Sequence, residues 1–313
     1  MISLNDVRAA AQRISGHVRR TPMTAADVLE RPIADVQVSL KLEYLQVTGS
    51  FKARGATNKL RATPPKELAN GIVTASGGNH GLATARAGRL AGVPTTIFLP
   101  DNASPAKQAK LRRWGANVRI SGSVWDETNI AALEHAKQTD TAYFHPFADP
   151  LIVAGQGTLG LEILEQAPSV DTILVAIGGG GLISGIATAV KALRPSVRII
   201  GIEPVGSPTL HASLKAGRAV TLEQVTTTVP TMAARRTDDR ILEIVRSRVD
   251  DIVLVTDEEM KAAAEWLWFE MGIAADLSGA ASIAALMTEK VRVDRDGHVC
   301  CLICGAGPDG ITG

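Results

Sequence analysis

Short apolar runs that alternate with helical patterns constrain the fold of this chain more than any other feature. Residues 71–75 and 94–99 are such runs, and a segment with helical periodicity follows each of them. Strands buried on both faces read as continuous apolar runs, and they occur in parallel sheets that helices cover on each side. The sequence therefore predicts an α/β fold with twisted, mostly parallel sheets. Further strands are predicted at 38–43, 116–120, 172–177, 197–203, 252–255 and 299–303.

The length of the chain predicts two lobes. Single hydrophobic cores stop growing at about 250–300 residues, and this chain has 313. The alternation of strands and helices also starts twice, first between 50 and 147 and again after residue 155. We therefore predict a small mobile domain at 50–147 and a large domain that combines 1–49 with 148–313.

Composition excludes several classes of function. The formal net charge is +1, so nothing favours binding to nucleic acid or to an anionic membrane. No apolar stretch approaches the roughly 20 residues that span a bilayer. The N-terminus lacks the basic and apolar regions of a signal peptide, and the three cysteines do not form a disulfide pattern. These features predict a cytoplasmic globular protein.

Four adjacent glycines, Gly178, Gly179, Gly180 and Gly181, join an apolar strand to a predicted helix at 182–193. Glycine lets the backbone N–H groups of such a turn close around an anion at the positive end of the helix. The turn is thus a candidate phosphate site, and the alternative is a tight turn without a ligand. The glycine spacing matches neither a dinucleotide-binding fingerprint nor a P-loop.

A second small-residue turn, Ser76-Gly77-Gly78-Asn79-His80-Gly81, also connects a strand to a helix. Its exposed N–H groups are suited to a carboxylate, and the amide of Asn79 is suited to a ring hydroxyl. An ordinary helix cap is the alternative. His80 taken alone is interpreted as a structural histidine rather than a base.

The stretch Ser50-Phe51-Lys52-Ala53-Arg54-Gly55-Ala56 places a lysine in the first turn of a predicted helix, with Ser50 as its N-cap. The helix dipole disfavours a cation there, so a neutral lysine or an imine suits the position better than a surface ammonium group. Two anion sites and one such lysine together predict a phosphorylated aldehyde cofactor, for which pyridoxal 5′-phosphate is the natural candidate.

These motifs resemble those of fold-type II pyridoxal-phosphate enzymes of the threonine dehydratase and serine racemase family, whose architecture is that of the tryptophan synthase β chain. The resemblance covers essentially the whole chain. Five elements match in order: residues 50–56, residues 76–80, Gly155-Gln156-Gly157-Thr158, Gly178 to Gly181, and Cys304-Gly305-Ala306-Gly307.

The resemblance implies a role for each motif. Lys52 would form the imine with the cofactor, Phe51 would pack near the ring, and Asn79 would bond the ring 3′-hydroxyl. The four glycines would hold the phosphate. The substrate carboxylate would be received by Ser76, Gly77, Asn79 and His80. The cofactor would lie in the large domain, and the enzyme would be a homodimer.

Cys304 falls where the family places a Ser or Cys against the pyridine nitrogen. A thiol or hydroxyl leaves this nitrogen neutral, and a neutral ring favours prompt loss of a β-substituent over a long-lived carbanion. Cys300 and Cys301 are assigned to buried strand packing. A zinc site would need further ligands, and none is evident.

The chain departs from the family at several positions. Gly77 replaces the serine that racemases use as a base, which favours elimination. Glu203 matches one ligand of the family's divalent-cation site, but Thr209 stands where an aspartate is expected, so we predict no metal and keep Glu203 only as a weak candidate. Segments 230–236 and 276–280 also differ from the dehydratase pattern, and we expect them to influence the choice of substrate.

The sequence thus predicts a lyase that dehydrates and deaminates a β-hydroxy amino acid, as threonine and serine dehydratases do, to a 2-keto acid and ammonia. One alternative is a dehydratase of hydroxyectoine utilisation that acts on a larger hydroxylated diamino acid. Others are an amino-acid racemase, a β-replacement synthase, a nicotinamide-dependent dehydrogenase and a non-catalytic binding protein. The substrate and its stereochemistry stay open at this point.

Overall fold

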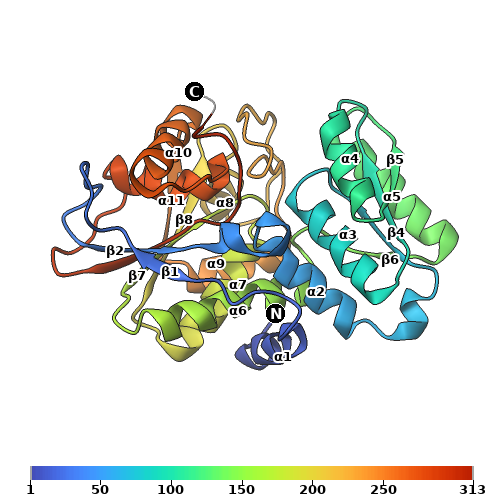
Figure 1. The fold of residues 1–313 in the computed structure, drawn as a ribbon, viewed down its shortest axis with the longest axis horizontal. Coiled ribbons are helices and arrows are strands. Elements are labelled where there is room, and N and C mark those ends of the chain that lie inside the picture. Colours follow the sequence, from blue (N-terminus) through green and yellow to red (C-terminus); the bar gives the residue numbers. More distant parts are fainter. Residues whose placement is uncertain (1, 312–313) are drawn as a thin grey trace.

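The computed structural model describes residues 2–311 and contains two separate β-sheets (Figure 1). The larger sheet has the strand order β1-β2-β10-β7-β8-β9, and the smaller one has the order β5-β4-β3-β6. Apart from the antiparallel pair β1–β2, all strand pairs are parallel, which confirms the predicted α/β class. The strands are β1 (Met23–Ala25), β2 (Gln37–Lys41), β3 (Ile72–Ala75), β4 (Thr95–Leu99), β5 (Asn117–Ile120), β6 (Ala142–Tyr143), β7 (Thr172–Ala176), β8 (Arg198–Pro204), β9 (Asp251–Val255) and β10 (His298–Leu302).

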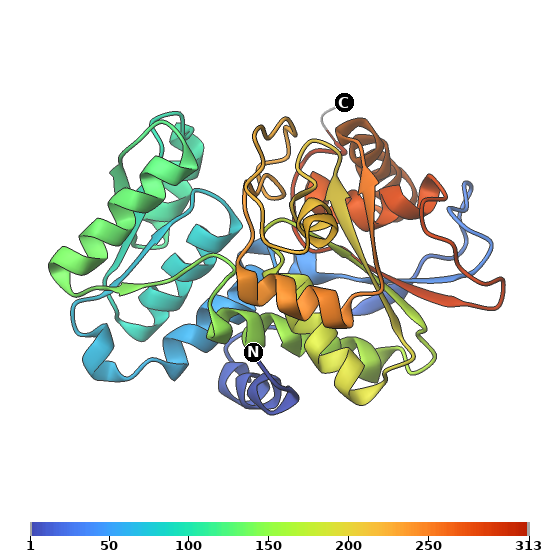
Figure 2. The same ribbon diagram turned by 180° about the vertical axis from the view of Figure 1, so that it is seen from behind.

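Helices cover both faces of each sheet. Around the larger sheet, α6, α7 and α9 lie on one side, and α10 and α11 lie on the other (Figure 2). The helices are α1 (Leu4–Ile14), α2 (Lys52–Ala62), α3 (Asn79–Ala91), α4 (Pro105–Arg113), α5 (Trp125–Thr139), α6 (Pro150–Gln166), α7 (Gly181–Leu193), α8 (Thr209–Ala216), α9 (Asp239–Arg248), α10 (Asp257–Met271) and α11 (Leu277–Met287). Short 3₁₀ turns lie at Glu43–Leu45, Val47–Gly49 and Pro65–Leu68.

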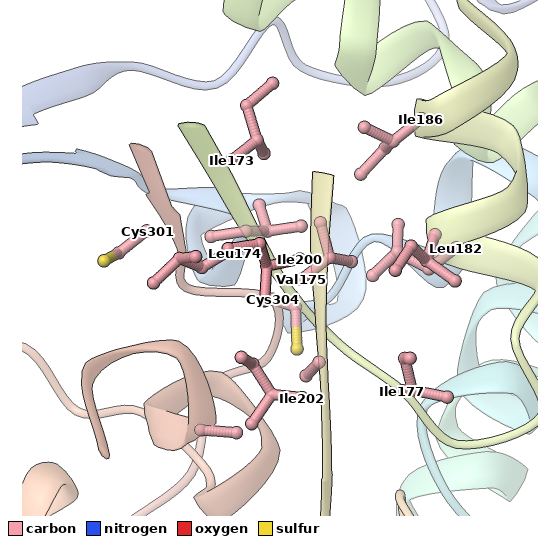
Figure 3. Packing of buried hydrophobic residues seen from close by; sticks show 14 of the residues in the cluster. Ile173, Leu174, Val175, Ile177, Leu182, Ile186, Ile200, Ile202, Cys301 and Cys304 are labelled. Atoms are coloured by element: carbon pink, nitrogen blue, oxygen red, sulfur yellow. The ribbon is translucent and has the colours of Figure 1, made fainter. Parts of the chain in front are cut away.

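The main core surrounds the central strands of the larger sheet. All five residues of β7 are buried, and all five of β10 are buried beside them. Figure 3 shows Cys301 and Cys304 among the aliphatic side chains of this cluster. Cys300 and Cys301 are inaccessible to solvent, as expected of strand-packing residues. Within residues 2–311, no helix combines the length and the apolar character needed to cross a membrane.

The smaller sheet separates two lesser cores. Ile97 and Leu99 of β4 pack with residues of α3 and α4, whereas Phe98 packs on the other face with Ala132 of α5. This division follows from the strand geometry, because successive side chains of a strand point to opposite faces. The sheet draws all its strands from residues 72–143, inside the segment predicted to be the small domain.

Helix α2 lies between the two sheets (Figure 1) and packs on both α3 and α6. The contact with α6 is very close, because a Cβ atom on Gly155 would come within 2.6 Å of the Cα atom of Gly55. Since α2 touches both lobes, the domain boundary at residue 50 and the mobility of the smaller lobe stay predictions.

The start of α2 differs from the prediction. Ser50 is not its N-cap: the residue is extended and pairs with Gly305 in an isolated bridge. Phe51 takes the cap position with no side-chain hydrogen bond, and its N–H donates to the carbonyl of Cys304. A pairing between residues far apart in sequence has therefore displaced the local capping preference.

Several other elements were missed. The strands β1 and β6 are short, whereas α9 has Ile241, Leu242, Ile244 and Val245 at helical spacing, so its signal was present in the sequence. β1, β6, α8, α9 and α11 were not predicted, and α8 and α9 occupy the Thr- and Arg-rich region between 205 and 250. α6 begins at Pro150 rather than at 155, because Asp149 caps it and accepts hydrogen bonds from the N–H groups of Leu151 and Ile152.

Candidate active site

Lys52 is the first residue of α2, as predicted, and it is partly buried. Its Nζ atom donates to the carbonyl of Pro146 at 2.8 Å and lies 5.1 Å from the centre of the Phe51 ring. Burial disfavours the ammonium form and lowers the pKa of Lys52 to about 8. Part of the amine is therefore neutral near neutral pH, which is the form that reacts with an aldehyde.

The predicted motif at 155–158 holds the helix that carries Lys52. Gln156 accepts a hydrogen bond from the N–H of Gly55 at 3.2 Å, and Thr158 accepts one from Arg54 at 3.1 Å. The motif therefore contributes to the site through the placement of α2.

The tetraglycine turn connects β7 to α7, as the sequence predicts. Gly180 has a φ of +90°, a value that favours glycine, and no side chain caps α7. A Cβ atom on Gly179 would lie 2.3 Å from the Phe147 ring, and one on Gly178 would lie 2.7 Å from the carbonyl of Thr231. Only glycine fits here, and the N–H groups at the positive end of α7 are free of a side-chain acceptor, so the turn suits a phosphate.

The turn at residues 76–81 also joins a strand to a helix that has no side-chain cap. α3 begins at Asn79 after the N-cap Gly78, again with no side-chain cap. The N–H of Gly78 donates to the hydroxyl of Ser76 at 3.4 Å. The first-turn N–H groups of a helix have no partner within the helix, so this end of α3 suits a carboxylate.

The imidazole ring of His80 is not placed to bind a carboxylate. It is buried, and its Nε2 atom lies 3.1 Å from the carbonyl of Phe144. Burial and the nearby Lys52 keep the pKa of His80 well below its ordinary value, so the ring stays neutral. His80 can thus serve an anion through its backbone N–H, in agreement with its interpretation as a structural histidine.

Cys304 lies just beyond the end of β10 and is buried among aliphatic side chains of the main core (Figure 3). Its thiol donates to the carbonyl of Ser278 at 3.4 Å. Burial and the nearby Asp276 raise the pKa of Cys304 above its usual range, so the group is a neutral thiol. Asp276 also accepts a hydrogen bond from the side chain of Asn79 at 3.3 Å, so Asn79 contacts the carboxyl group that lies near Cys304.

The segment from Phe144 to Phe147 joins the predicted elements, and sequence reasoning missed it. The carbonyls of Phe144 and Pro146 contact His80 and Lys52, and Phe147 packs on the tetraglycine turn. His145 shapes the segment, because its Nδ1 atom accepts from the N–H groups of Phe147 and Ala148 at 3.2 and 2.9 Å. No sequence signal marked the segment, because β6, the strand that precedes it, has only two residues and was not predicted.

Glu203 has a different role from that of a metal ligand. Both of its oxygens accept N–H groups from the start of α8, those of Leu210 and His211, each at 2.8 Å. Thr209 donates its hydroxyl to the carbonyl of Ala234. Among the residues that the structure describes, no three His, Cys, Asp or Glu side chains are grouped to hold a metal ion.

The arrangement fits a phosphorylated aldehyde. A reactive amine, a glycine cradle for a phosphate and a neutral thiol are linked through residues 144–147 and 276–278. Helices α3 and α7, which follow the two small-residue turns, have no side-chain cap, as is also true of α5, whereas Ser3, Asp149 and Thr256 cap α1, α6 and α10. The start of α2 differs, because the N–H of Gly55 donates to Gln156. The uncapped starts of α3 and α7, each after a glycine-containing turn, suit a ligand with more than one anionic group.

Comparisons with known proteins agree with this interpretation. The chain is 38% identical over 98% of its length to L-threonine ammonia-lyase of Thermotoga maritima, of which it covers 76%. It is 36% identical over 99% of its length to a catabolic L-threonine dehydratase of Staphylococcus aureus, of which it covers 90%. Among solved structures, maize serine racemase matches with a TM-score of 0.92 and 32% identity over 97% of this chain and 93% of that one.

A solved threonine deaminase from T.th. matches with a TM-score of 0.89 and 35% identity, over 97% of this chain and 98% of that one. Residues 14–305 match the family described as pyridoxal-phosphate dependent enzymes. The chain therefore belongs to the pyridoxal-phosphate dependent enzyme family, in the group of threonine dehydratases and serine racemases.

Proposed function

We propose that this protein is a pyridoxal-phosphate dependent ammonia-lyase, which converts a β-hydroxy amino acid of the threonine or serine type to a 2-keto acid and ammonia. The observation that carries the proposal is the partly neutral amine of Lys52 between two uncapped helix ends, in a chain similar over its whole length to L-threonine ammonia-lyases. When bound, pyridoxal phosphate supplies an aldehyde that condenses with amines and a ring that withdraws electrons from the α-carbon.

The family resemblance suggests which residues would hold the cofactor, and their geometry supports these roles. Gly178 to Gly181, with the end of α7, would bind the phosphate. Asn79 would bond the ring hydroxyl, and the ring of Phe51, next to Lys52, would pack near the pyridine ring. Cys304 would face the ring nitrogen as a neutral thiol, because its raised pKa prevents ionisation. A neutral partner does not stabilise a protonated ring nitrogen, and this favours loss of a β-substituent.

Lys52 would act as the general base. Burial lowers the pKa of its amine to about 8, so the partly neutral amine could accept the α-proton of the substrate. The carbonyl of Pro146 holds its Nζ atom in position. The N–H groups of Asn79 and His80, together with Ser76 and Gly77, would fix the substrate carboxylate and so orient the α-carbon.

Gly77 favours elimination over racemisation. A racemase needs a second proton-carrying group on the face opposite the lysine. Gly77 has no side chain, and a Cβ atom there would lie 3.1 Å from a methyl group of Leu99, so the site is tight as well as aprotic. Since maize serine racemase is structurally similar, this residue is the main local argument for a lyase.

The proposal is tested by incubating the purified enzyme with L-threonine, L-serine, 3-hydroxyaspartate and hydroxyectoine-derived diamino acids. Ammonia and 2-keto acid are measured together, and the residual amino acid is analysed for chirality. K52A should lose both turnover and the imine absorbance near about 410 nm. Turnover retained in K52A would contradict the proposal, and D-amino acid without keto acid would favour a racemase.

We also propose a mobile smaller lobe at 50–147, a homodimer and a cytoplasmic location. The smaller sheet, built only from residues 72–143, supports the first of these. The second rests on the family resemblance, and the third on the sequence features described under Sequence analysis. Light scattering tests the dimer, and hydrogen exchange with and without substrate tests the motion.

A further inference from the structure

A hydrogen bond between the two lobes passes through the candidate active site. Asn79 begins α3, beside the smaller sheet, and Asp276 precedes α11, beside the larger one. The Nδ2 atom of Asn79 donates to Oδ2 of Asp276 at 3.3 Å, across 197 positions of sequence. One hydrogen of the Asn79 amide is thus committed to the opposite lobe, and the second hydrogen stays available for another acceptor.

Asp276 itself is held firmly. Its Oδ1 atom accepts from the hydroxyl of Ser278 and from the N–H of Gly279, both at 2.7 Å, and so caps α11. Its own N–H donates to the carbonyl of Gly305 at 3.0 Å. With Oδ1 and the backbone fixed, Oδ2 is left to face Asn79.

The glycines that follow Cys304 make room for this carboxyl group. A Cβ atom on Gly305 would lie 2.5 Å from Oδ2 of Asp276, and one on Gly307 would lie 2.7 Å from its Cβ atom. The motif Cys304-Gly305-Ala306-Gly307 therefore leaves the space that the side chain of Asp276 occupies. The same turn carries the thiol at one end, so Asp276 lies between Asn79 and Cys304.

We propose that Asp276 is a positioning residue for Asn79, and that from the opposite lobe it fixes the plane of the amide that binds the ring hydroxyl of the cofactor. The inference rests on the proposed function. Oδ1 already accepts two hydrogen bonds and Oδ2 accepts from Asn79, so the carboxyl group selects the Nδ2 side of the amide over the flipped orientation. Burial raises the pKa of Asp276, and its bonds to Ser278, Gly279 and Asn79 oppose that rise.

The decisive variant is D276N, which keeps the size and shape of the side chain. An amide can present its oxygen either to the α11 cap or to Asn79, but not to both. D276S is the second variant, because a serine can cap α11 and is too short to reach Asn79. T256A is the matched control: it removes the cap of α10, where Thr256 accepts from the N–H of Glu259, away from the site.

We expect D276N and D276S to weaken pyridoxal phosphate binding and to lower kcat, each on the order of 10-fold, the loss of one charge-assisted hydrogen bond. The absorbance of the bound cofactor should also shift, because a hydrogen bond to the ring hydroxyl sets its tautomer. T256A should melt earlier and keep the spectrum, the dissociation constant and kcat of the parent protein.

A double-mutant cycle with N79A separates positioning from a merely structural role. If Asp276 acts through Asn79, D276N should change cofactor binding by less than about 2-fold in the N79A background. Additive losses in the cycle, or an unchanged spectrum in D276N, would overturn the inference. The spectral and binding arms need no turnover, so they decide the inference even if the parent protein proves not to be a lyase.

Discussion

Arg54 should be among the residues whose loss most destabilises this protein, and its surroundings allow the effect to be estimated. Its guanidinium group is buried and pairs with two carboxylates. Nε and Nη2 donate to Glu43 at 2.6 and 2.9 Å, and Nη1 and Nη2 donate to Glu162 at 2.6 and 3.0 Å. The side chains of Arg54 and Glu43 are 1% and 0% exposed. Lys41 is the second cation, 2.6 Å from Glu162, and it balances the charge.

R54A would leave Glu43 buried without a cation. Thr21 and Gln46 would still donate to it, but both are neutral. Breaking a buried ion pair by removing one partner costs about 3–5 kcal/mol. At roughly 2–4 °C for each kcal/mol in a large domain, the melting temperature should fall by about 10 °C. Although burial opposes it, Arg54 also lowers the pKa of Glu162, so the stabilisation from this ion pair is complete above the usual carboxylate pKa and is lost as the pH falls through the lowered pKa of Glu162.

The assay is thermal unfolding of the apo protein, followed by circular dichroism and by dye fluorescence. R246A is the control, because Arg246 forms an exposed pair with Glu243 at 3.1 Å, and such pairs contribute about 0–1 kcal/mol. Adding E43Q to R54A should recover part of the loss, since it removes the unpaired charge. A melting temperature for R54A within about 2 °C of the parent protein, or equal to that of R246A, would refute the reasoning.

Three further outcomes are expected. G179A should bind pyridoxal phosphate at least about 10-fold more weakly, because its Cβ atom would overlap the Phe147 ring at 2.3 Å. A titration of the apo protein checks this, and G217A is the control: its φ of +70° strains the backbone, but its Cβ atom meets nothing within 4 Å and it lies outside the tetraglycine turn. The rate of imine formation in the apo protein should rise with pH through a midpoint of about 8, because only the neutral amine of Lys52 reacts; a midpoint near that of an ordinary lysine, about 10.4, would contradict the lowered pKa. G77S, combined with L99V to relieve the 3.1 Å contact, should form detectable D-serine from L-serine, whereas the parent protein should form none. Chiral chromatography measures the D-serine, and racemisation by the parent protein would count against the role given to Gly77.

Sequence reasoning reached the fold class and the motifs because both depend on local patterns. Gly178 to Gly181 and Ser76 to Gly81 each follow an apolar run and open a helix, and these turns adopt the predicted strand-to-helix placement. The α/β architecture and the pyridoxal-phosphate family are confirmed as well. The roles of individual residues toward the cofactor stay predictions, for which the structure supplies geometry.

What sequence reasoning missed depends on contacts between distant segments. Ser50 has the composition of an N-cap, yet its backbone pairs with Gly305. Phe147 and Pro146 follow a two-residue strand too short to detect, yet they contact the tetraglycine turn and Lys52. No local pattern marks such residues, because their partners lie in segments far away along the chain.

By itself, the sequence determined the α/β class, the glycine turns that expose N–H groups, and the presence of one lysine at a helix start. These follow from side-chain periodicity and from the backbone freedom of glycine, which act over a few residues. Only the tertiary structure decided that Lys52 loses part of its positive charge, that Glu203 caps α8, and that Asp276 reaches Asn79. Burial and hydrogen-bond partners decide those properties, and both arise only when distant segments pack together.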